Sequence, residues 1–385
     1  MSRTCTQLKM KGLFIVFCII VCGLQLTFAQ LKVYPAPRYI DQKPAKQQLL
    51  SARKKATLDT LSLPFWDDFS VSYGMYPDTL KWIDSYAIWI NNGMAINQPT
   101  INVATFDGLD SAGRAYNPND VFVVGYTDAL TSRPIDLSET GLPVAERESV
   151  YLSFFYQWQG NGEAPDDEDY LQLEFKDAEG GWAPAITISP QADFDRTQFY
   201  DAIVNVGEEY FHNHFQFRFR SYGRNSGPYD TWNIDYVYLN ANRNANDFGF
   251  SDRAIASPLS SLFQKYYAIP YEHFKTSKAL QPVTFEATNL DITFSVVEYD
   301  AIATFINYTH SGDEALRETY SIPLASGQGI AGGSGFMDAK GRVLATLPSL
   351  PNPDDSQQFN PIADSVDVTI KVELNSNDVN STFFC

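Results

Sequence analysis

The sequence predicts an all-β protein, in which a jelly-roll β-sandwich is followed by a second, immunoglobulin-like β-sandwich. Aromatic residues make up 14% of the 385 residues, with 22 Tyr and 27 Phe, and such a composition favours strands. Apolar and polar residues alternate with a period of two along most of the chain, and helical periodicity is almost absent. Clusters of Gly, Pro, Asn and Asp separate these runs. Many short alternating runs of this kind are typical of antiparallel sheets packed face to face.

Residues 1–29 have the features of a secretory signal peptide. Three basic residues precede the apolar run 13–22, and Ala29 ends a small-residue cleavage site. The run is shorter than the ~20 residues that a membrane-spanning helix needs, which disfavours a membrane anchor. Cys22 would be the site of an alternative lipoprotein interpretation, which the bulky Val21 before it disfavours. We therefore expect an exported protein that crosses the periplasm to the cell surface or the extracellular space.

Cleavage after Ala29 changes both the charge and the cysteine content. The net charge of −18 becomes −21 when three basic residues are removed, and Cys385 is left as the single thiol. No internal disulfide can then form, so packing alone must hold the core. The excess of 46 acidic over 28 basic residues disfavours a nucleic-acid partner. No later run of 18 apolar residues is present, so we expect no transmembrane segment after cleavage.

The mature chain divides by composition into four parts. Residues 30–60 carry seven basic and two acidic residues and are expected to be a basic flexible leader. We expect the jelly-roll sandwich at 61–244, a connector at 245–283 and the immunoglobulin-like sandwich at 284–385. The last segment ends at Cys385 without a closing turn or polar tail, and one interpretation of this ending is a truncated chain.

Five segments show the strand pattern most clearly, with apolar residues on one face or on both. These segments are 150–158, 170–176, 211–220, 234–239 and 366–374. Only Ser260–Tyr267 and Arg53–Leu58 are candidates for short helices or turns.

Five short motifs occur in a recognisable order: 64–70 (PFWDDFS), 103–110 (VATFDGLD), 132–137 (SRPIDL), 166–175 (DDEDYLQLEF) and 232–240 (WNIDYVYLN). This order resembles the N-terminal jelly-roll region of large Bacteroidetes cell-surface proteins, many of which use the type IX secretion route. It is also similar to MAM-type and carbohydrate-binding jelly rolls. The resemblance covers about 61–270 and implies architecture and compartment, with the export machinery as a partner. Members usually end in a C-terminal sorting domain, and none is visible in this sequence.

The resemblance also implies a structural calcium ion. In carbohydrate-binding jelly rolls that contain calcium, an acid near the first strand and another in the last strand commonly bind the ion. Asp68 and Asp235 occupy comparable places here. Calcium needs several oxygen ligands, so loop carbonyls would have to complete the site. The alternative is that Asp68 caps a turn and that Asp235 hydrogen-bonds the backbone.

A polar strip is the candidate ligand site. In the run 211–220, Phe215, Phe217 and Phe219 alternate with polar residues on the other face. The polar residues proposed as ligand contacts are His212, His214, Arg218 and Arg220. Tyr229, Trp232 and Trp158 are candidates for stacking on a sugar ring, although core packing explains Trp158 better. An ordinary solvated sheet face is the competing interpretation.

Catalytic signatures are absent from the sequence, so we do not expect an enzyme. Residues 327–332 match the pattern G-x-G-x-x-G, but Gly333, Ser334 and Gly335 follow instead of a helix that could bind phosphate. The sequence therefore favours an exported, non-catalytic binding or adhesion protein with a glycan or surface protein as its ligand. Two alternatives stay open: accessory modules of a secreted hydrolase whose catalytic domain is missing, and a structural subunit of an envelope assembly.

Overall fold

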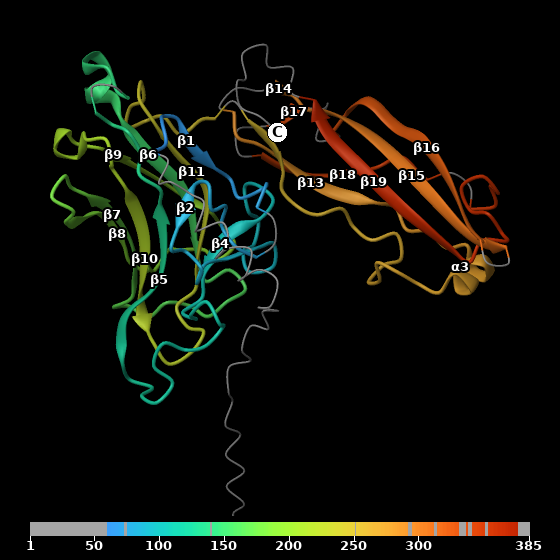
Figure 1. The fold of residues 1–385 in the computed structure, drawn as a ribbon, viewed down its shortest axis with the longest axis horizontal. Helices are drawn as coiled ribbons and strands as arrows, with labels where there is room; N and C mark the ends of the chain where they lie inside the picture. Colours follow the sequence, from blue (N-terminus) through green and yellow to red (C-terminus); the bar gives the residue numbers. More distant parts are fainter. Residues whose placement is uncertain are drawn as a thin grey trace, which may run out of the picture. The chain divides into compact units, whose positions relative to one another are not determined.

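A computed structural model describes residues 60–72, 75–138, 141–250, 252–291, 295–311, 314–330, 336–337, 341–350 and 353–375. The expected signal peptide, nearly all of the leader, the expected short element 53–58, residues 331–335 of the glycine-rich segment and the ending 376–385 lie outside these residues. The described residues are nearly all β, and the predicted fold class is confirmed (Figure 1).

One sheet of the first sandwich has the strand order β3-β4-β11-β6-β9, and β1 also pairs with β11. All of its pairs are antiparallel. Its strands are β1 (Phe65–Asp67), β3 (Trp89–Asn91), β4 (Val103–Phe106), β6 (Tyr151–Trp158), β9 (Tyr200–Asn205) and β11 (Trp232–Asn240).

The other sheet of the first sandwich has the order β2-β5-β10-β7-β8 and is also antiparallel. Its strands are β2 (Trp82–Ile83), β5 (Val124–Ser132), β7 (Tyr170–Lys176), β8 (Trp182–Ile188) and β10 (Phe217–Arg224). Two short 3-10 helices, η1 (Val144–Ser149) and η2 (Glu208–Tyr210), lie in the connections.

The core of the first sandwich fills the space between these two sheets. Inward residues come from the predicted alternating runs, including Leu152 and Phe154 of β6, Leu173 of β7, and Phe217 and Phe219 of β10. Burying aromatic rings of this size removes a large apolar area from water, which stabilises the sandwich without disulfides. The predicted inward faces of β6, β7 and β10 are therefore confirmed.

A bulge interrupts the alternation in β11. Its pairing with β6 shifts register between Asp235 and Tyr238, and Tyr236 has a φ of 51°, in the left-handed region. Ile234 and Val237 both point into the core, whereas Tyr236 packs in a separate cluster. The sequence predicted a continuous alternation here, and this was wrong because one extra residue in a strand reverses the faces beyond it.

The second sandwich consists of two three-stranded sheets, β12-β13-β18 and β16-β15-β19, in the part of the chain that the structure describes. A buried cluster that includes Phe285, Tyr299 and Ala345 joins them. The strands are β12 (Arg253–Ile255), β13 (Thr284–Asn289), β15 (Glu298–Ser311), β16 (Glu314–Gly329), β18 (Gly341–Thr346) and β19 (Ser365–Asn375). A short pair is formed by β14 (Ser295–Val296) and β17 (Phe336–Met337).

The expected connector 245–283 contains two elements of the second sandwich. Strand β12 pairs with β13, and the single α-helix of the described residues, α3 (Tyr271–Ser277), buries Phe274 beside Phe305 of β15. A three-residue strand is too short to show a periodic pattern, so the sequence did not reveal it. Ser260–Tyr267 forms turns with two isolated bridges, one of which joins Ser261 to Gln264, and not a helix.

Among the described residues, no helix combines the length and the apolar character needed to cross a membrane.

Candidate functional site

Strand β10 carries the centre of the candidate site. Phe217 and Phe219 are fully buried in the core, so the alternation directs Arg218 and Arg220 to the outer face of the sheet. A β-strand presents every second side chain to one face, and the neighbouring strands β5, β7 and β8 add theirs. We call these side chains the outer-face strip: Tyr126, Tyr170, Gln172, Glu174, Lys176, Trp182, Arg218, Arg220 and Tyr222.

The register of the sheet places the outer-face strip in rows across the strands. Tyr222 of β10 lies opposite Tyr126 of β5 on one side and Tyr170 of β7 on the other. The next rows along β10 pair Arg220 with Gln172 and Arg218 with Glu174. Directly opposed side chains on one face contact one another, so each row is a continuous surface.

The first row is a block of three tyrosine rings. Tyr170 and Tyr222 stack with ring centroids 4.7 Å apart and an interplanar angle of 2°. Tyr126 meets Tyr222 edge-on at 5.4 Å and Tyr170 edge-on at 6.2 Å. Tyr126 is 39% exposed, and its hydroxyl donates to Gln172 Oε1 at 3.1 Å. The rings therefore hold one another in place while part of their surface faces solvent.

Behind the tyrosines, two arginines share one buried carboxylate. Arg218 Nε donates to Glu174 Oε2, and Arg220 Nη1 lies 3.8 Å from Glu174 Oε1. The guanidinium of Arg218 lies 4.2 Å from the ring centroid of Trp182, and that of Arg220 lies 3.5 Å from the ring centroid of Tyr126. Arginine stacks well on aromatic faces and leaves its N–H edges free in doing so.

Burial of Glu174 explains why this arrangement is fixed. Only 5% of Glu174 is exposed, although it points to the outer face, because the side chains around it cover the carboxylate. A buried carboxylate is tolerated when it is paired with positive charge. Gln172 beside it is also buried and donates to Thr187 Oγ1 at 2.9 Å. Lys176 donates to Gln216 Oε1 at 2.9 Å and completes the polar network.

The predicted histidines lie just before β10 and not on it. Residues 212–214 form a turn, so the expectation that His212 and His214 belong to a strand was wrong. Their rings are nevertheless adjacent, with centroids 4.4 Å apart, and His212 Nε2 lies 3.1 Å from the carbonyl oxygen of Lys176. Burial lowers the pKa of His212, which favours its neutral form. The pair marks the end of the outer-face strip at Lys176.

Tyr229 and Trp232 have different positions. Tyr229 lies in the loop after β10, with the guanidinium of Arg224 5.3 Å from its ring centroid, and marks the other end of β10. Trp232 is fully buried in the core of the first sandwich, so its proposed role in stacking on a sugar was wrong. Trp232 and Ile234 are two residues apart on β11, so both side chains point to the same face of the sheet, into the core. Trp158 packs against the same core, as expected.

The sequence did not identify the aromatic half of the strip. Tyr222 continues the alternation of Arg218 and Arg220, so its position was available from the pattern. Tyr126 lies on β5, whose sequence VGYTDALTS mixes small, polar and apolar residues and shows no clear period. Trp182 lies on β8, an edge strand whose third residue is Pro184.

Asp68 and Asp235 are both buried in the first sandwich, with exposures of 6% and 0%. Thr100 links them, because its hydroxyl lies 2.9 Å from the carbonyl oxygen of Asp68 and 3.0 Å from Asp235 Oδ1. Backbone N–H groups of Thr100 and Tyr236 also donate to the carboxylate of Asp235. Burial raises the pKa of Asp68 to about 6 and raises that of Asp235 well above its usual range, and Asp68 adds a like-charge contribution to the latter.

These residues partly fit a calcium ion. Neighbouring Asp67 is ion-paired with Lys81 at 3.0 Å, whereas no ion pair of Asp68 or Asp235 is found among the described residues. A hard cation would neutralise both carboxylates. In the part of the chain that the structure describes, no group of three or more His, Cys, Asp or Glu side chains could hold a metal ion. Backbone carbonyls would therefore have to supply most of the ligands. The hydrogen bonds of Asp235 agree equally with the purely structural alternative.

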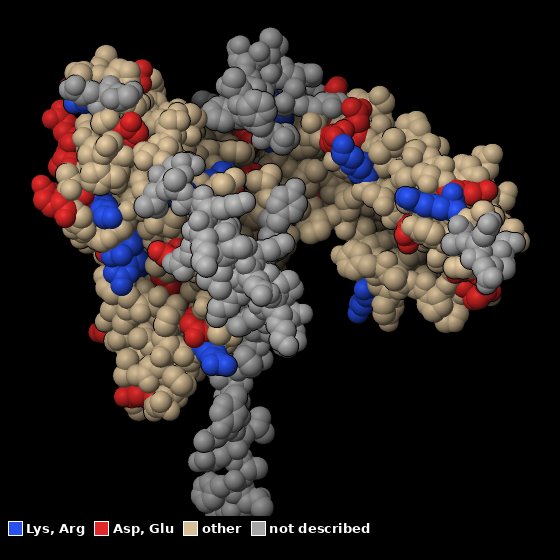
Figure 2. Space-filling model, viewed as in Figure 1, with Lys and Arg blue, Asp and Glu red and all other residues tan. Residues whose placement is uncertain are grey.

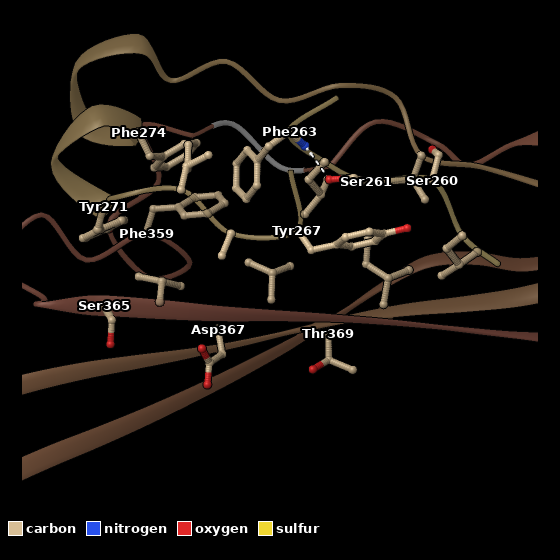
Figure 3. A pocket seen from close by; sticks show the side chains of 18 of the residues that line it. Ser260, Ser261, Phe263, Tyr267, Tyr271, Phe274, Phe359, Ser365, Asp367 and Thr369 are labelled. Atoms are coloured by element: carbon tan, nitrogen blue, oxygen red, sulfur yellow. Dashed lines mark hydrogen bonds between the residues drawn. The ribbon is translucent and has the colours of Figure 1, made fainter. Parts of the chain in front are cut away.

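The second sandwich has a groove of about 600 Å³ beside β19 (Figure 3). Its wall carries the rings of Phe263, Phe274 and Phe359, and Figure 3 shows Asp367 and Thr369 on the opposite side of β19 from these rings. Polar residues such as Ser260 and Ser261 also line the groove, but none of its described lining residues is a cation that could pair with the aromatic rings as in the outer-face strip. The outer-face strip is therefore the stronger candidate site.

Comparison with known proteins gives only distant structural likeness. No family model matches the chain, and no curated protein matches it. The CBM22-1 xylan-binding domain of Xyn10C from Paenibacillus barcinonensis is 11% identical, with a TM-score of 0.27, and the match covers 49% of this chain and 99% of that domain. The CBM22-1-CBM22-2 tandem of the same protein is 9% identical, with a TM-score of 0.22 and coverages of 85% and 95%.

The glycoside hydrolase domain of Endo-D from Streptococcus pneumoniae R6 is 9% identical, with a TM-score of 0.27, and the match covers 74% of this chain and 43% of that chain. TM-scores this low give no information about the ligand. The candidate site therefore depends on the side chains described above.

Proposed function

We propose that this protein is an exported, non-catalytic surface protein that binds glycans through the outer-face strip. The observation that carries the proposal is the row of three opposed tyrosines, Tyr126, Tyr170 and Tyr222, which continues directly into the row of Arg220 and Gln172. Sugar rings present apolar C–H faces that pack on aromatic surfaces, and their hydroxyl groups need donors and acceptors nearby. The strip offers both kinds of contact on one rigid sheet.

The rigidity of the strip supports binding without a conformational change. Tyr126 is held by Gln172, and Arg218 is held by Glu174 and Trp182. Side chains that are ordered before the ligand arrives lose little conformational entropy on binding. A sheet face of this kind suits an extended chain of sugars that crosses several strands.

Export and surface location belong to the same proposal. They are supported by the basic flank, short apolar run and small-residue exit at 1–29 in the sequence. The type IX route and the Bacteroidetes origin are supported by the five ordered motifs and stay predictions. A protein ligand is the alternative that the binding experiment below would reveal.

A structural calcium ion at Asp68 and Asp235 is the second part of the proposal. The two buried carboxylates and the carbonyl oxygen of Asp68 would supply ligands, and the ion would offset their mutual repulsion. Its role would be to stabilise the first sandwich and not to contact the glycan.

The experiment that tests glycan binding compares Tyr222→Ala with the unchanged chain on a glycan array, followed by calorimetry on the glycans that bind. Loss of the central ring should weaken binding at least about tenfold, or about 1.4 kcal/mol. Tyr266→Ala is the matched control, because Tyr266 is 66% exposed and does not line the groove of the second sandwich. Equal affinity of both variants and the unchanged chain would remove the outer-face strip as the site.

A further inference from the structure

The charge of the outer-face strip differs in sign from that of the whole molecule. The protein has a net charge of −18, yet the rows behind the tyrosines contain Lys176, Arg218 and Arg220 against a single carboxylate, that of Glu174. Figure 2 shows basic side chains grouped over the region of β7, β8 and β10. A local excess of positive charge on an acidic protein needs a physical reason.

Packing of the core does not supply that reason. One arginine would be enough to neutralise Glu174, and Arg218 already contacts it directly through Nε. Arg220 lies farther away, at 3.8 Å, and no hydrogen bond of its guanidinium is found among the described residues. The side chain of Arg220 is 24% exposed, so its N–H groups can reach a ligand.

The electrostatic surroundings of Arg220 also favour a negatively charged ligand. Burial lowers the pKa of Arg220, and the like charge of Arg218 lowers it further, while Glu174 has the opposite effect. The positive charge of this arginine is therefore only partly compensated. An added negative charge would stabilise it.

The geometry of the guanidinium groups favours oxyanions that can accept two hydrogen bonds at once. The guanidinium carbon of Arg220 lies 3.5 Å from the ring centroid of Tyr126 and that of Arg218 lies 4.2 Å from the ring centroid of Trp182, so each ring covers one side of a guanidinium group. No hydrogen bond of the terminal N–H groups of either arginine is found among the described residues, so these groups can donate to a ligand. Guanidinium edges bind carboxylates and similar oxyanions through paired hydrogen bonds. Neutral sugar hydroxyls do not require two such groups side by side.

We propose that the ligand of the outer-face strip is an anionic polysaccharide, whose carboxylate or sulfate groups bind Arg220 and the free N–H groups of Arg218 while its sugar rings pack on the tyrosines. This inference rests on the proposed glycan-binding function and narrows its substrate class. Lys176, at the end of the strip near Trp182, adds positive charge along the same path.

The test uses pairs of polysaccharides that share a backbone and differ in charge. Polygalacturonate is compared with its methyl ester, and dextran sulfate is compared with dextran, by affinity electrophoresis of the full chain. We expect at least about tenfold tighter binding to one or both anionic members, and a loss of that advantage in 0.5 M NaCl, because salt screens exposed charges. The two pairs distinguish carboxylate from sulfate as the bound group.

Variants separate the charge from the aromatic contribution. Arg220→Gln should weaken binding of the anionic member about tenfold and leave the neutral member unchanged, whereas Tyr222→Ala should weaken both. Arg220 is preferred to Arg218 for this test because Glu174 keeps its direct partner. Arg220→Lys keeps the charge but removes the planar fork, and should recover only part of the affinity.

Each outcome has a distinct meaning. Equal binding of the charged and neutral members, with loss of both in Tyr222→Ala, would overturn the anionic ligand and leave the glycan-binding function in place. Failure of every polysaccharide and of the glycan array to bind would overturn the proposed function itself. A melting curve of each variant identifies any loss of folding, and Arg220→Lys then provides the comparison in a folded protein.

Discussion

Glu174 organises the outer face of the first sandwich at the scale of single residues. Its carboxylate is almost fully buried and is held by Arg218, while Arg220 lies at a longer distance. The cost of burying such a charge is offset only while a cation stays beside it. Glu174 therefore fixes the side chain of Arg218, which lies against Trp182, whereas Arg220 lies against Tyr126. A solvated sheet face would not need a buried carboxylate.

Asp235 allows a sharp test of the calcium proposal. If the ion binds, Asp235→Asn removes a ligand, so the variant should be less stable and its melting temperature should no longer respond to calcium or EDTA. If no ion binds, the variant should still lose stability, because both carboxylate oxygens of Asp235 accept from backbone N–H groups and the amide NH2 cannot, but the melting temperature of the unchanged chain should then not respond to calcium or EDTA either. Calorimetry with calcium and with EDTA measures the difference.

The control for this experiment is Asp128→Asn. Asp128 is equally buried but bonds to Asp107, Gly108 and Tyr116 instead. That variant should keep the full response to calcium. An unchanged chain that melts at the same temperature with calcium and with EDTA would rule out the ion.

At the scale of elements, the loop after β4 and the loop after β10 approach each other closely at Gly108. Gly108 has a φ of 71°, and a Cβ atom there would lie 2.9 Å from the carbonyl oxygen of Gly227 and 3.1 Å from that of Tyr229. Gly108→Ala should therefore destabilise the protein by about 2–4 kcal/mol, the sum of a left-handed backbone and a displaced loop. Thermal melting measures the loss.

Gly180→Ala separates the two contributions. Gly180 also has a positive φ, of 89°, but a Cβ atom there would meet only the side chain of Lys176 at 3.9 Å. Its cost should be about 1 kcal/mol, from the backbone conformation alone. If both variants lost the same free energy of unfolding, the close approach of the two loops at Gly108 would contribute nothing to the loss.

Strand β10 shows what a sequence can predict about an element. Its alternation is regular enough that the pattern alone places Phe217 and Phe219 inside and Arg218 and Arg220 outside. Strand β11 looks just as regular, but the left-handed Tyr236 carries no signal in the sequence that marks a bulge. A local pattern shows which face of the sheet each side chain lies on only as long as no bulge adds a residue to the strand.

The site itself was only half predictable for a related reason. Arg218 and Arg220 lie next to each other in one strand, whereas Tyr126 and Tyr170 come from different strands and lie 44 residues apart in the sequence. Pairing between such strands depends on the register of the whole sheet, which no local window contains. Trp232 was misplaced because an aromatic residue at the end of a strand fits either a ligand site or a core.

At the scale of the whole molecule, acidic groups dominate both the surface and several buried positions. The net charge of −18 opposes a compact state through self-repulsion, and the opposition grows as more carboxyl groups ionise. Burial raises the pKa of Asp128 to about 8 and that of Asp230 to about 7. These two groups hold protons in the folded state that the unfolded chain releases near its ordinary pKa of about 3.9.

Stability should therefore fall as the pH rises from 6.5 to 8.5. In this window the folded state binds more protons than the unfolded state, so the free energy of unfolding decreases with pH. Burial of His212 lowers its pKa, and its opposite contribution fades above about pH 6.5, where the unfolded imidazole also loses its proton. Calorimetric melting temperatures across the window check the slope.

Asp128→Asn should flatten the dependence of stability on pH, because the side chain then has no proton to release. Its amide oxygen can still accept from the backbone N–H groups of Asp107 and Gly108. A melting temperature that rises with pH, or a slope that the variant leaves unchanged, would show that Asp128 ionises normally in the folded protein.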